Sequence, residues 1–238
     1  MESMRVEVWS DIACPWCWVG KRRLEGALSR FAHADRVEVV WRAFELDPSA
    51  PKVRDDGLAY AERLGRKYGT SASQAELMIQ RMTDTAAKDG IVMRFDRIQP
   101  GNTFDAHRLL HLAHERGVQD ALKERLFRAY LGEGEPIGDH ATLARLAGDA
   151  GLDVDEATAV LATDSYAKEV RADEREAASL GVSGVPFFAL AGRYGVSGAQ
   201  PVDALLQVLE RAWTETMGKG LVEAVPAEGA VCGPGGCA

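Results

Sequence analysis

Two cysteines separated by two residues, Cys14 and Cys17, lie where a predicted strand runs into a predicted helix. Pro15 suits the first turn of that helix, because the backbone N–H that proline lacks is not needed there. Residues three apart in a helix share a face, so the two sulfurs can come within reach of a disulfide bond. The free N–H groups at the helix start would stabilise a thiolate and lower the pKa of Cys14. We therefore predict that Cys14 is a nucleophile and that Cys17 is its resolving partner.

Two other interpretations of this pair stay open on spacing alone. The cysteines could form half of a zinc site, or they could be two unreactive residues of the core. A preceding strand and a following helix favour redox chemistry, because zinc-binding pairs of this spacing usually lie on hairpin turns.

The length, the net charge and the distribution of apolar residues exclude several classes of protein. The 238 residues exceed a common single domain of about 100 to 150 residues. The net charge of −8 argues against nucleic acid or an anionic membrane as the main partner. The first residues lack the apolar run of a secretory signal, and no stretch approaches the length of a transmembrane helix. We expect a cytoplasmic protein, in which four cysteines are more often catalytic, regulatory or metal-binding than structural.

The periodicity of apolar residues divides the chain into three parts. Apolar runs around Val6 and at Val37–Phe44 flank a helical pattern from Trp16 to Ala32, which predicts a β-α-β unit with parallel strands. A helical block follows, with caps expected at Ser71 and Asp153. Its predicted helices are Tyr60–Tyr68, Ser73–Lys88, Phe104–Arg116, Gln119–Leu131, Ala141–Ala150 and Asp155–Leu161.

The last part returns to strands. A helix at Tyr166–Leu180 precedes two short apolar runs, Gly184–Leu190 and Tyr194–Ser197, which predict a β-hairpin, and a final helix covers Val202–Trp213. We therefore expect a discontinuous α/β domain over residues 4–47 and 165–216, an all-helical insertion over 48–164, and a poorly ordered tail over 217–238.

Four spaced motifs carry a resemblance to a known family. They are Asp11–Arg23 around the cysteines, Asn102–Leu109, Gly181–Phe187 and Val196–Pro201. With them, residues 4 to 215 resemble the DsbA branch of thioredoxin-like proteins, and in particular its cytoplasmic FrnE-type members. These are relatives of the 2-hydroxychromene-2-carboxylate isomerases and the kappa-class glutathione transferases. The resemblance implies a thioredoxin-like fold with a large helical insertion.

The resemblance also assigns a role to Val185 and Pro186. It implies that they form a cis-proline loop facing the thiols, where the Val185 backbone can pair with a substrate strand. Without the family, an ordinary trans proline at the start of a strand would be favoured.

Two departures from the family pattern matter. Periplasmic DsbA proteins have His between the proline and the second cysteine, whereas this chain has Trp16. Because Trp16 offers no charge to a thiolate, we expect a less oxidising protein, closer to an isomerase or reductase. Many thioredoxin-like proteins also carry a buried carboxylate six residues before the first cysteine, where this chain has Val8. Asp11 is the nearest carboxylate in sequence, and we expect it to cap the helix start.

Candidate substrate-binding residues follow Pro100. In the glutathione-dependent relatives this region contributes to the substrate cleft, which makes Asn102, Thr103, Phe104 and His107 candidates to line it. With equal weight, Asn102 or Thr103 is only a helix cap and His107 lies on the surface. Trp16, Trp18 and Phe104 would supply apolar surface to an unfolded peptide or a small thiol.

A second cysteine pair, Cys232 and Cys237, ends the chain with four residues between them. Gly and Pro in the intervening Gly-Pro-Gly-Gly favour a tight turn, so this pair can close a small disulfide ring. It could exchange electrons with Cys14 and Cys17, be an incidental tail, or share in binding zinc.

The resulting hypothesis is a cytoplasmic thiol-disulfide oxidoreductase or disulfide isomerase. Its substrates would be disulfide-containing proteins or small thiols; it requires no organic cofactor, and glutathione is a candidate thiol co-substrate. We assign no metal ligands and no oligomeric state. One rival is a glutathione-dependent isomerase or transferase, against which the retention of Cys17 counts. The other is an interaction protein in which all four cysteines bind metal.

Overall fold

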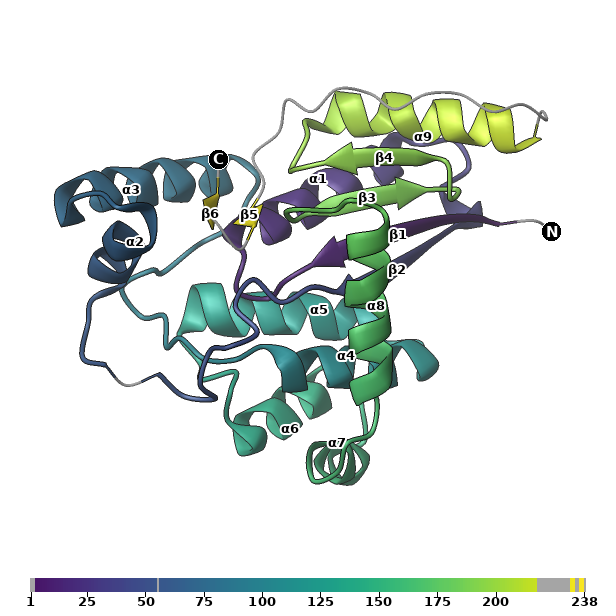
Figure 1. Ribbon diagram of the computed structural model, residues 1–238. Coiled ribbons are helices and arrows are strands. Elements are labelled where there is room, and N and C mark those ends of the chain that lie inside the picture. The colour runs from purple at the N-terminus through teal and green to yellow at the C-terminus, as the bar shows by residue number, and fades with distance from the viewer. Residues whose placement is uncertain (1–2, 55, 218–231, 234–235, 238) are drawn as a thin grey trace.

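A four-stranded mixed sheet lies at the centre of the computed structural model, which describes residues 3–54, 56–217, 232–233 and 236–237 (Figure 1). The strand order is β2-β1-β3-β4. β1 (Met4–Ser10) is parallel to β2 (Val37–Ala43), while β3 (Phe187–Leu190) pairs antiparallel with both β1 and β4 (Tyr194–Ser197). The predicted β-α-β unit and the predicted hairpin are therefore confirmed.

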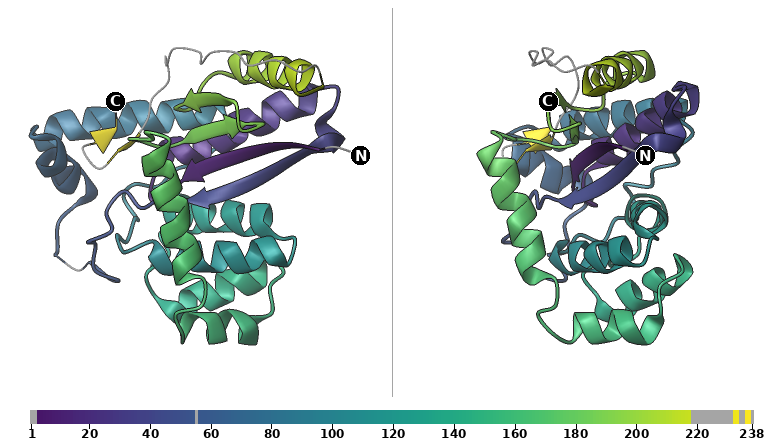
Figure 2. Two further views of the ribbon diagram at one scale, coloured as in Figure 1. Left: turned by 45° about the vertical axis from the view of Figure 1, so that its right-hand side comes forward. Right: turned by 90° about the vertical axis from the view of Figure 1, so that its right-hand side faces the viewer.

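Helices cover both faces of this sheet (Figure 2). α1 (Pro15–Arg30) connects β1 to β2, with a short 3₁₀ turn at Ala34–Arg36, and packs beside α9 (Val202–Met217) on one face. α8 (Ala167–Ser179) and two helices of the insertion contact β2 from the other face.

The insertion contains α2 (Tyr60–Tyr68), α3 (Ala72–Lys88), α4 (Phe104–Glu115), α5 (Gln119–Phe127), α6 (His140–Asp149) and α7 (Val154–Leu161). The predicted caps are confirmed: Ser71 Oγ accepts from Gln74 N at 3.2 Å, and Asp153 Oδ1 accepts from Glu156 N at 2.9 Å.

One predicted helix, Gln119–Leu131, differs from the structure. α5 ends at Phe127, and a π-helical turn at Arg128–Glu133 follows. Gly134 closes this turn in the left-handed conformation, with φ of 79°, where a side chain would also collide with the Arg97 carbonyl. The glycine therefore stops the helical pattern and turns the chain.

Two apolar cores hold the layers together. Val6 and Val8 of β1 point into the core beneath α1 and α9, which also contains Phe188 and Leu209. Trp9 points to the opposite face and joins a larger core, which includes Cys14, Cys17 and residues of the insertion. Strand alternation thus places the thiols in the core that the sheet shares with the insertion.

The boundaries expected at residues 47/48 and 164/165 fall in segments between secondary-structure elements, and the domain division stays a prediction. The predicted disorder of the tail concerns residues that lie mostly outside the described ranges. Within them, β5 (Cys232–Gly233) pairs antiparallel with β6 (Gly236–Cys237). Among the described helices, none combines the length and the apolar character needed to cross a bilayer.

Candidate active site

Cys14 and Cys17 lie at the start of α1. Cys14 is the N-cap residue, Pro15 occupies the first turn, and Cys17 N donates to Cys14 O at 3.1 Å. Both cysteines are free thiols and both are fully buried. The sequence pattern therefore placed the pair correctly at the N-terminus of a helix.

The loop before β3 closes over this pair. The Val185–Pro186 peptide bond is cis, and the Cys14 thiol donates to the Val185 carbonyl at an Sγ···O distance of 3.7 Å. Gly20 lets α1 approach this loop, since a Cβ there would lie 2.9 Å from Pro186 Cγ. The structure thus brings Val185 and Pro186 to the thiols, and their part in substrate binding stays a prediction.

The pKa of Cys14 differs from the sequence expectation. The helix N-terminus is in place, but burial raises the pKa of this thiol well above its ordinary value, and Cys17 and Asp11 add to the rise. Removing the sulfur from water outweighs the favourable helix end. The expectation of a lowered pKa is therefore wrong for this closed arrangement.

Asp11 does not cap the helix, contrary to the expectation. Its Oδ1 accepts from Ala13 N at 3.3 Å and its Oδ2 from Leu46 N at 2.7 Å, which ties the loop after β1 to the segment after β2. His107 Nε2 lies 3.5 Å from Asp11 Oδ1. Burial alone would raise the pKa of Asp11, but the nearby imidazole of His107 and the hydrogen bond from Leu46 N hold it below its ordinary value.

His107 comes from α4 and is 1% exposed, so the alternative of a surface residue is wrong, and it is not among the residues that line the cavity described below. Burial lowers its pKa, and the nearby carboxylate of Asp11 opposes this shift only in part. A buried carboxylate and a buried imidazole therefore lie behind the thiol loop.

Lys123 of α5 is a further buried group near the thiols, and the sequence reasoning missed it. It is fully buried, and its Nζ donates to Ser10 O at 3.2 Å. The Nζ also lies 5.6 Å from the ring centroid of Trp41 and 5.1 Å from that of Phe127. Burial lowers the pKa of Lys123 to about 8, although Cys17, Asp11 and Cys14 favour its charge. A lysine on an amphipathic helix gives no sequence signal of such burial.

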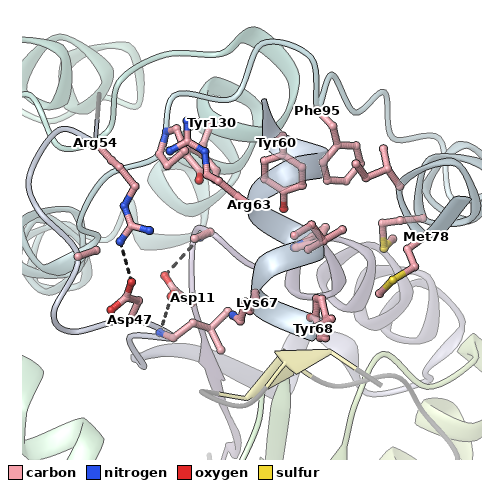
Figure 3. Close-up of a pocket in the computed structure, with 18 of the residues that line it drawn as sticks. Asp11, Asp47, Arg54, Tyr60, Arg63, Lys67, Tyr68, Met78, Phe95 and Tyr130 are labelled. Carbon is pink, nitrogen blue, oxygen red and sulfur yellow. Dashed lines mark hydrogen bonds and ion pairs between the residues drawn. The ribbon is translucent and has the colours of Figure 1, made fainter. Parts of the chain in front are cut away.

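A cavity of about 1070 Å³ opens beside the cysteine motif, and its lining includes Pro15 and Trp16. Residues of α2 and α3, such as Tyr60 and Met78, also line it (Figure 3). Apolar side chains such as Tyr60 and Phe95, whose ring centroids are 5.1 Å apart, form much of its lining. Arg54 lines it too and pairs with Asp47 at 2.9 Å (Figure 3).

The cavity rim also carries exposed cations. Arg66, Lys67 and Arg81 line the cavity from α2 and α3. None of the three forms an ion pair with another described residue. The cavity beside the thiols is thus apolar inside with positive charge at its edge.

The structure does not bring all of the predicted substrate-binding residues to the cavity. Trp16 lines the cavity, but Trp18, Asn102 and Phe104 are not among its lining residues. Trp18 is buried against Phe127 with ring centroids 6.1 Å apart, because its side chain points into the core.

The other two are engaged in local structure. Asn102 Oδ1 accepts from Phe104 N at 2.8 Å, which is an Asx turn at the start of α4, and the Phe104 ring packs 4.3 Å from the Arg171 guanidinium. Thr103, a further candidate to line the cleft, does line the cavity, as does its neighbour Gly101.

The C-terminal strands lie close to the thiol loop. A Cβ at Gly233 of β5 would be 2.4 Å from Ser183 O, so β5 touches the backbone just before Val185 and Pro186. Cys232 and Cys237 are partners in the β5–β6 register, and their side chains lie outside the described part of the structure.

Comparison with known proteins agrees with this geometry. The model of the DSBA-like thioredoxin domain matches residues 5–210. The uncharacterised protein YwbO of Bacillus subtilis (strain 168) is 32% identical over 165 residues, which are 69% of this chain and 74% of that protein.

Solved structures of DsbA-type proteins also resemble this chain. A probable DsbA oxidoreductase from Streptomyces coelicolor is 49% identical, with a TM-score of 0.84 over 99% of this chain and 98% of that one. The cytosolic disulfide reductase DsbM from Pseudomonas aeruginosa, solved with GSH, shares the fold at 19% identity and a TM-score of 0.52, over 90% of this chain and 98% of that one. This chain combines a thiol pair at a helix start, a cis-proline loop and a helical insertion. It belongs to the family of DSBA-like thioredoxin domains.

Proposed function

We propose that the protein is a cytoplasmic thiol-disulfide oxidoreductase or disulfide isomerase that uses Cys14 and Cys17. The observation that carries this proposal is the free thiol pair at the start of α1, held against Val185 O and flanked by a large cavity. The similarity to a probable DsbA oxidoreductase at 49% identity supports it.

The reaction consists of two exchanges. The Cys14 thiolate attacks one sulfur of a substrate disulfide, which releases the other sulfur as a thiolate and leaves a mixed disulfide on Cys14. Cys17 then attacks the Cys14 sulfur, so the mixed disulfide breaks, a Cys14–Cys17 disulfide forms, and the second substrate thiolate leaves. Two electrons pass from the enzyme to the substrate.

The thiol environment supports a reductase or isomerase more than a strong oxidant. Trp16 supplies no positive charge, and burial raises the pKa of Cys14. Both effects leave the thiolate poorly stabilised, which weakens the reduced state and lowers the reduction potential.

The cavity suggests the substrate class. Its apolar walls suit a protein segment or a small thiol, and its exposed cations Arg66, Lys67 and Arg81 favour substrates with carboxylates. Glutathione fits this description as a thiol co-substrate, and DsbM, which has the same fold, was solved with GSH. No organic cofactor enters the proposed cycle. Nucleic acid and membranes are not proposed partners of this acidic chain.

Cys232 and Cys237 are proposed as a second redox pair. Residues directly opposite in an antiparallel pair have Cα atoms about 4.5 to 5.5 Å apart, within the range that a disulfide spans. The contact of Gly233 with Ser183 brings the backbone of this hairpin to the thiol loop, so exchange with Cys14 would be intramolecular.

Single-cysteine variants test the proposal. Cys14→Ser is expected to abolish reduction of insulin disulfides, and Cys17→Ser to accumulate a mixed disulfide on Cys14, identified by mass spectrometry. A Cys232→Ser, Cys237→Ser background keeps the tail from contributing. Trapping through Cys17 instead would reverse the assignment of the two thiols. Full activity of Cys17→Ser with glutathione on an isomerase substrate would favour the glutathione-dependent isomerase or transferase.

A further inference from the structure

The chain has no carboxylate at the position behind the thiols where many thioredoxin-like proteins carry one. Val8 occupies that position and is fully buried in the core beneath α1 and α9. Cys17 must nevertheless lose a proton before it can attack the mixed disulfide, because the thiolate is the nucleophile. Another buried group must therefore balance the charge that appears on its sulfur.

Lys123 has the geometry for this role. Its Nζ bonds to Ser10 O, in the strand that leads into the cysteine loop, at 3.2 Å. It also lies against the ring of Phe127, which in turn stacks on Trp18, the residue after Cys17. The insertion thus places a buried amine against Phe127, a residue of the core that also contains both thiols.

This ammonium lacks the partner that a buried charge normally has. Within residues 3–54 and 56–217, no carboxylate forms an ion pair with Lys123, whereas the nearby buried Lys21 lies among Glu25, Asp120 and Glu124. A buried charge without a counter-ion is costly, and a new anion beside it gains correspondingly. Among the described residues, Lys123 is therefore a buried positive charge without an ion-pair partner, beside the core that holds the thiols.

The charged and titratable groups around Lys123 indicate which anion it meets. The favourable ones are Cys17, then Asp11, then Cys14, while Lys21 of α1 and His107 of α4 oppose its charge. Asp11 is already bound by Ala13, Leu46 and His107. Cys17 thus remains as the group whose ionisation Lys123 can balance.

We propose that the Lys123 ammonium is the buried counter-charge of the resolving thiolate and so favours loss of the Cys17 proton. This inference rests on the proposed disulfide exchange. The Cys17 proton leaves to water, and the thiolate that forms is balanced by the ammonium of Lys123. Lys123 touches no substrate and acts only through Cys17, as a positioning residue.

The cycle balances without another reactant. The Cys17 thiolate attacks the Cys14 sulfur, the Cys14–substrate bond breaks, and the electron pair leaves with the substrate thiolate, which takes a proton from water. In the oxidised enzyme neither thiol carries charge, so the ammonium is again unpaired.

The experiment compares the two steps of exchange with oxidised glutathione across pH, in a Cys232→Ser, Cys237→Ser background. Formation of the mixed disulfide is followed in Cys17→Ser, and its resolution in protein with both thiols. Lys123→Met should slow resolution at neutral pH by about tenfold or more and move its pH midpoint upward, as loss of a close opposite charge does. Formation of the mixed disulfide should change much less.

Two further variants separate charge from structure. Lys123→Arg, which keeps the charge at all pH values, should restore fast resolution and remove the dependence on the lysine's titration. Lys21→Met is the matched control, because that buried lysine already has carboxylate partners, and its profile should follow the parent protein. Ultraviolet absorbance of the thiolate in a Cys14→Ser background reports the ionisation of Cys17 without any turnover, and Lys123→Met should move that titration to higher pH.

The outcomes are distinguishable. If the parent protein forms no mixed disulfide with any disulfide offered, the proposed function fails, while the absorbance titration still tests the Lys123–Cys17 coupling. If exchange proceeds and Lys123→Met leaves both the resolution profile and the titration unchanged, the inference about Lys123 is overturned. Equal slowing of both steps would also overturn it, since that indicates a general structural defect.

Discussion

The sheet side and the insertion side of the thiol pair differ in chemistry. The sheet and its loops supply mainly apolar groups, Trp9, Ile12 and Val185, together with one buried carboxylate, Asp11. The insertion supplies two basic side chains, His107 of α4 and Lys123 of α5, which are also buried. The thioredoxin-like layer thus holds the two sulfurs in place, whereas the insertion supplies groups that respond to their charge.

The two cores show the same contrast. The core beneath α1 and α9 is built from apolar residues of the strands and helices around it, including Phe188. The larger core contains both thiols together with Phe127 of the insertion. A change of equal size in the two cores should therefore cost similar stability but affect the thiols differently.

Phe127→Ala and Phe188→Ala test this contrast with the largest expected effect. Both rings are fully buried, so each change should cost roughly 3 to 5 kcal/mol of unfolding free energy in urea titrations. Only Phe127→Ala should also alter the pH profile of mixed-disulfide resolution, because that ring stacks on Trp18 and contacts Lys123. Equal changes of the profile in both variants would remove the distinction between the cores.

Lys123→Met is expected to stabilise the protein at neutral pH. Burial lowers the pKa of Lys123 from 10.5 to about 8. At ~1.4 kcal/mol per unit, the buried charge costs roughly 3 kcal/mol. Loss of the bond to Ser10 O offsets about 1 kcal/mol of this, which leaves a net gain of roughly 2 kcal/mol.

The pH dependence checks the cause of this gain. The folded protein binds this proton more weakly than the unfolded chain, so the cost is complete below pH 8 and disappears as pH rises toward 10.5. Urea titrations at neutral and alkaline pH should therefore show the difference between variant and parent shrinking with pH. A difference that stays constant would mean that packing, and not charge, is responsible.

The contrast between the two sides also explains how much could be predicted from the sequence. Some sequence signals depend only on residues that are close in the chain: Pro15 after Cys14, strand alternation at Val6 and Val8, and helical periodicity in the insertion. These signals predicted the sheet, the hairpin and the helix start correctly. Local patterns also predicted the caps at Ser71 and Asp153.

The rest of the site depends on contacts between distant segments. Lys123 looks like a solvent-facing residue of an amphipathic helix, and only the approach of α5 to Ser10 buries it. Asp11 looks like a helix cap, but its carboxylate accepts a hydrogen bond from Leu46 N and lies beside the imidazole of His107. The low pKa expected for Cys14 follows from the helix end alone, whereas the closure of the surrounding core reverses it.

Trp16→His tests the sheet side of the thiol pair with a smaller expected effect. An imidazolium beside Cys14 stabilises the thiolate, so the pKa of Cys14 should fall and the protein should become more oxidising. A change of about one pKa unit corresponds to roughly 30 mV for a two-electron couple. Equilibration against glutathione buffers measures this shift, and Trp18→His is a matched control because Trp18 faces the core. An unchanged potential in Trp16→His would show that Trp16 does not set the redox poise.

The tail pair is expected to have the smallest effect, because in the proposed cycle it would exchange with the main pair and would not replace it. The backbone of β5 touches Ser183, next to Val185 and Pro186, so the hairpin is already close to Cys14 and needs no long excursion of the chain. A Cys232→Ser, Cys237→Ser double variant should keep its fold and its single-turnover reaction with small thiols. Its steady-state turnover should fall by a few-fold, since reoxidation or re-reduction must then come from solution at a lower effective concentration. Stopped-flow kinetics beside steady-state assays separates the two quantities, and matching turnover rates would leave Cys232 and Cys237 outside the catalytic cycle.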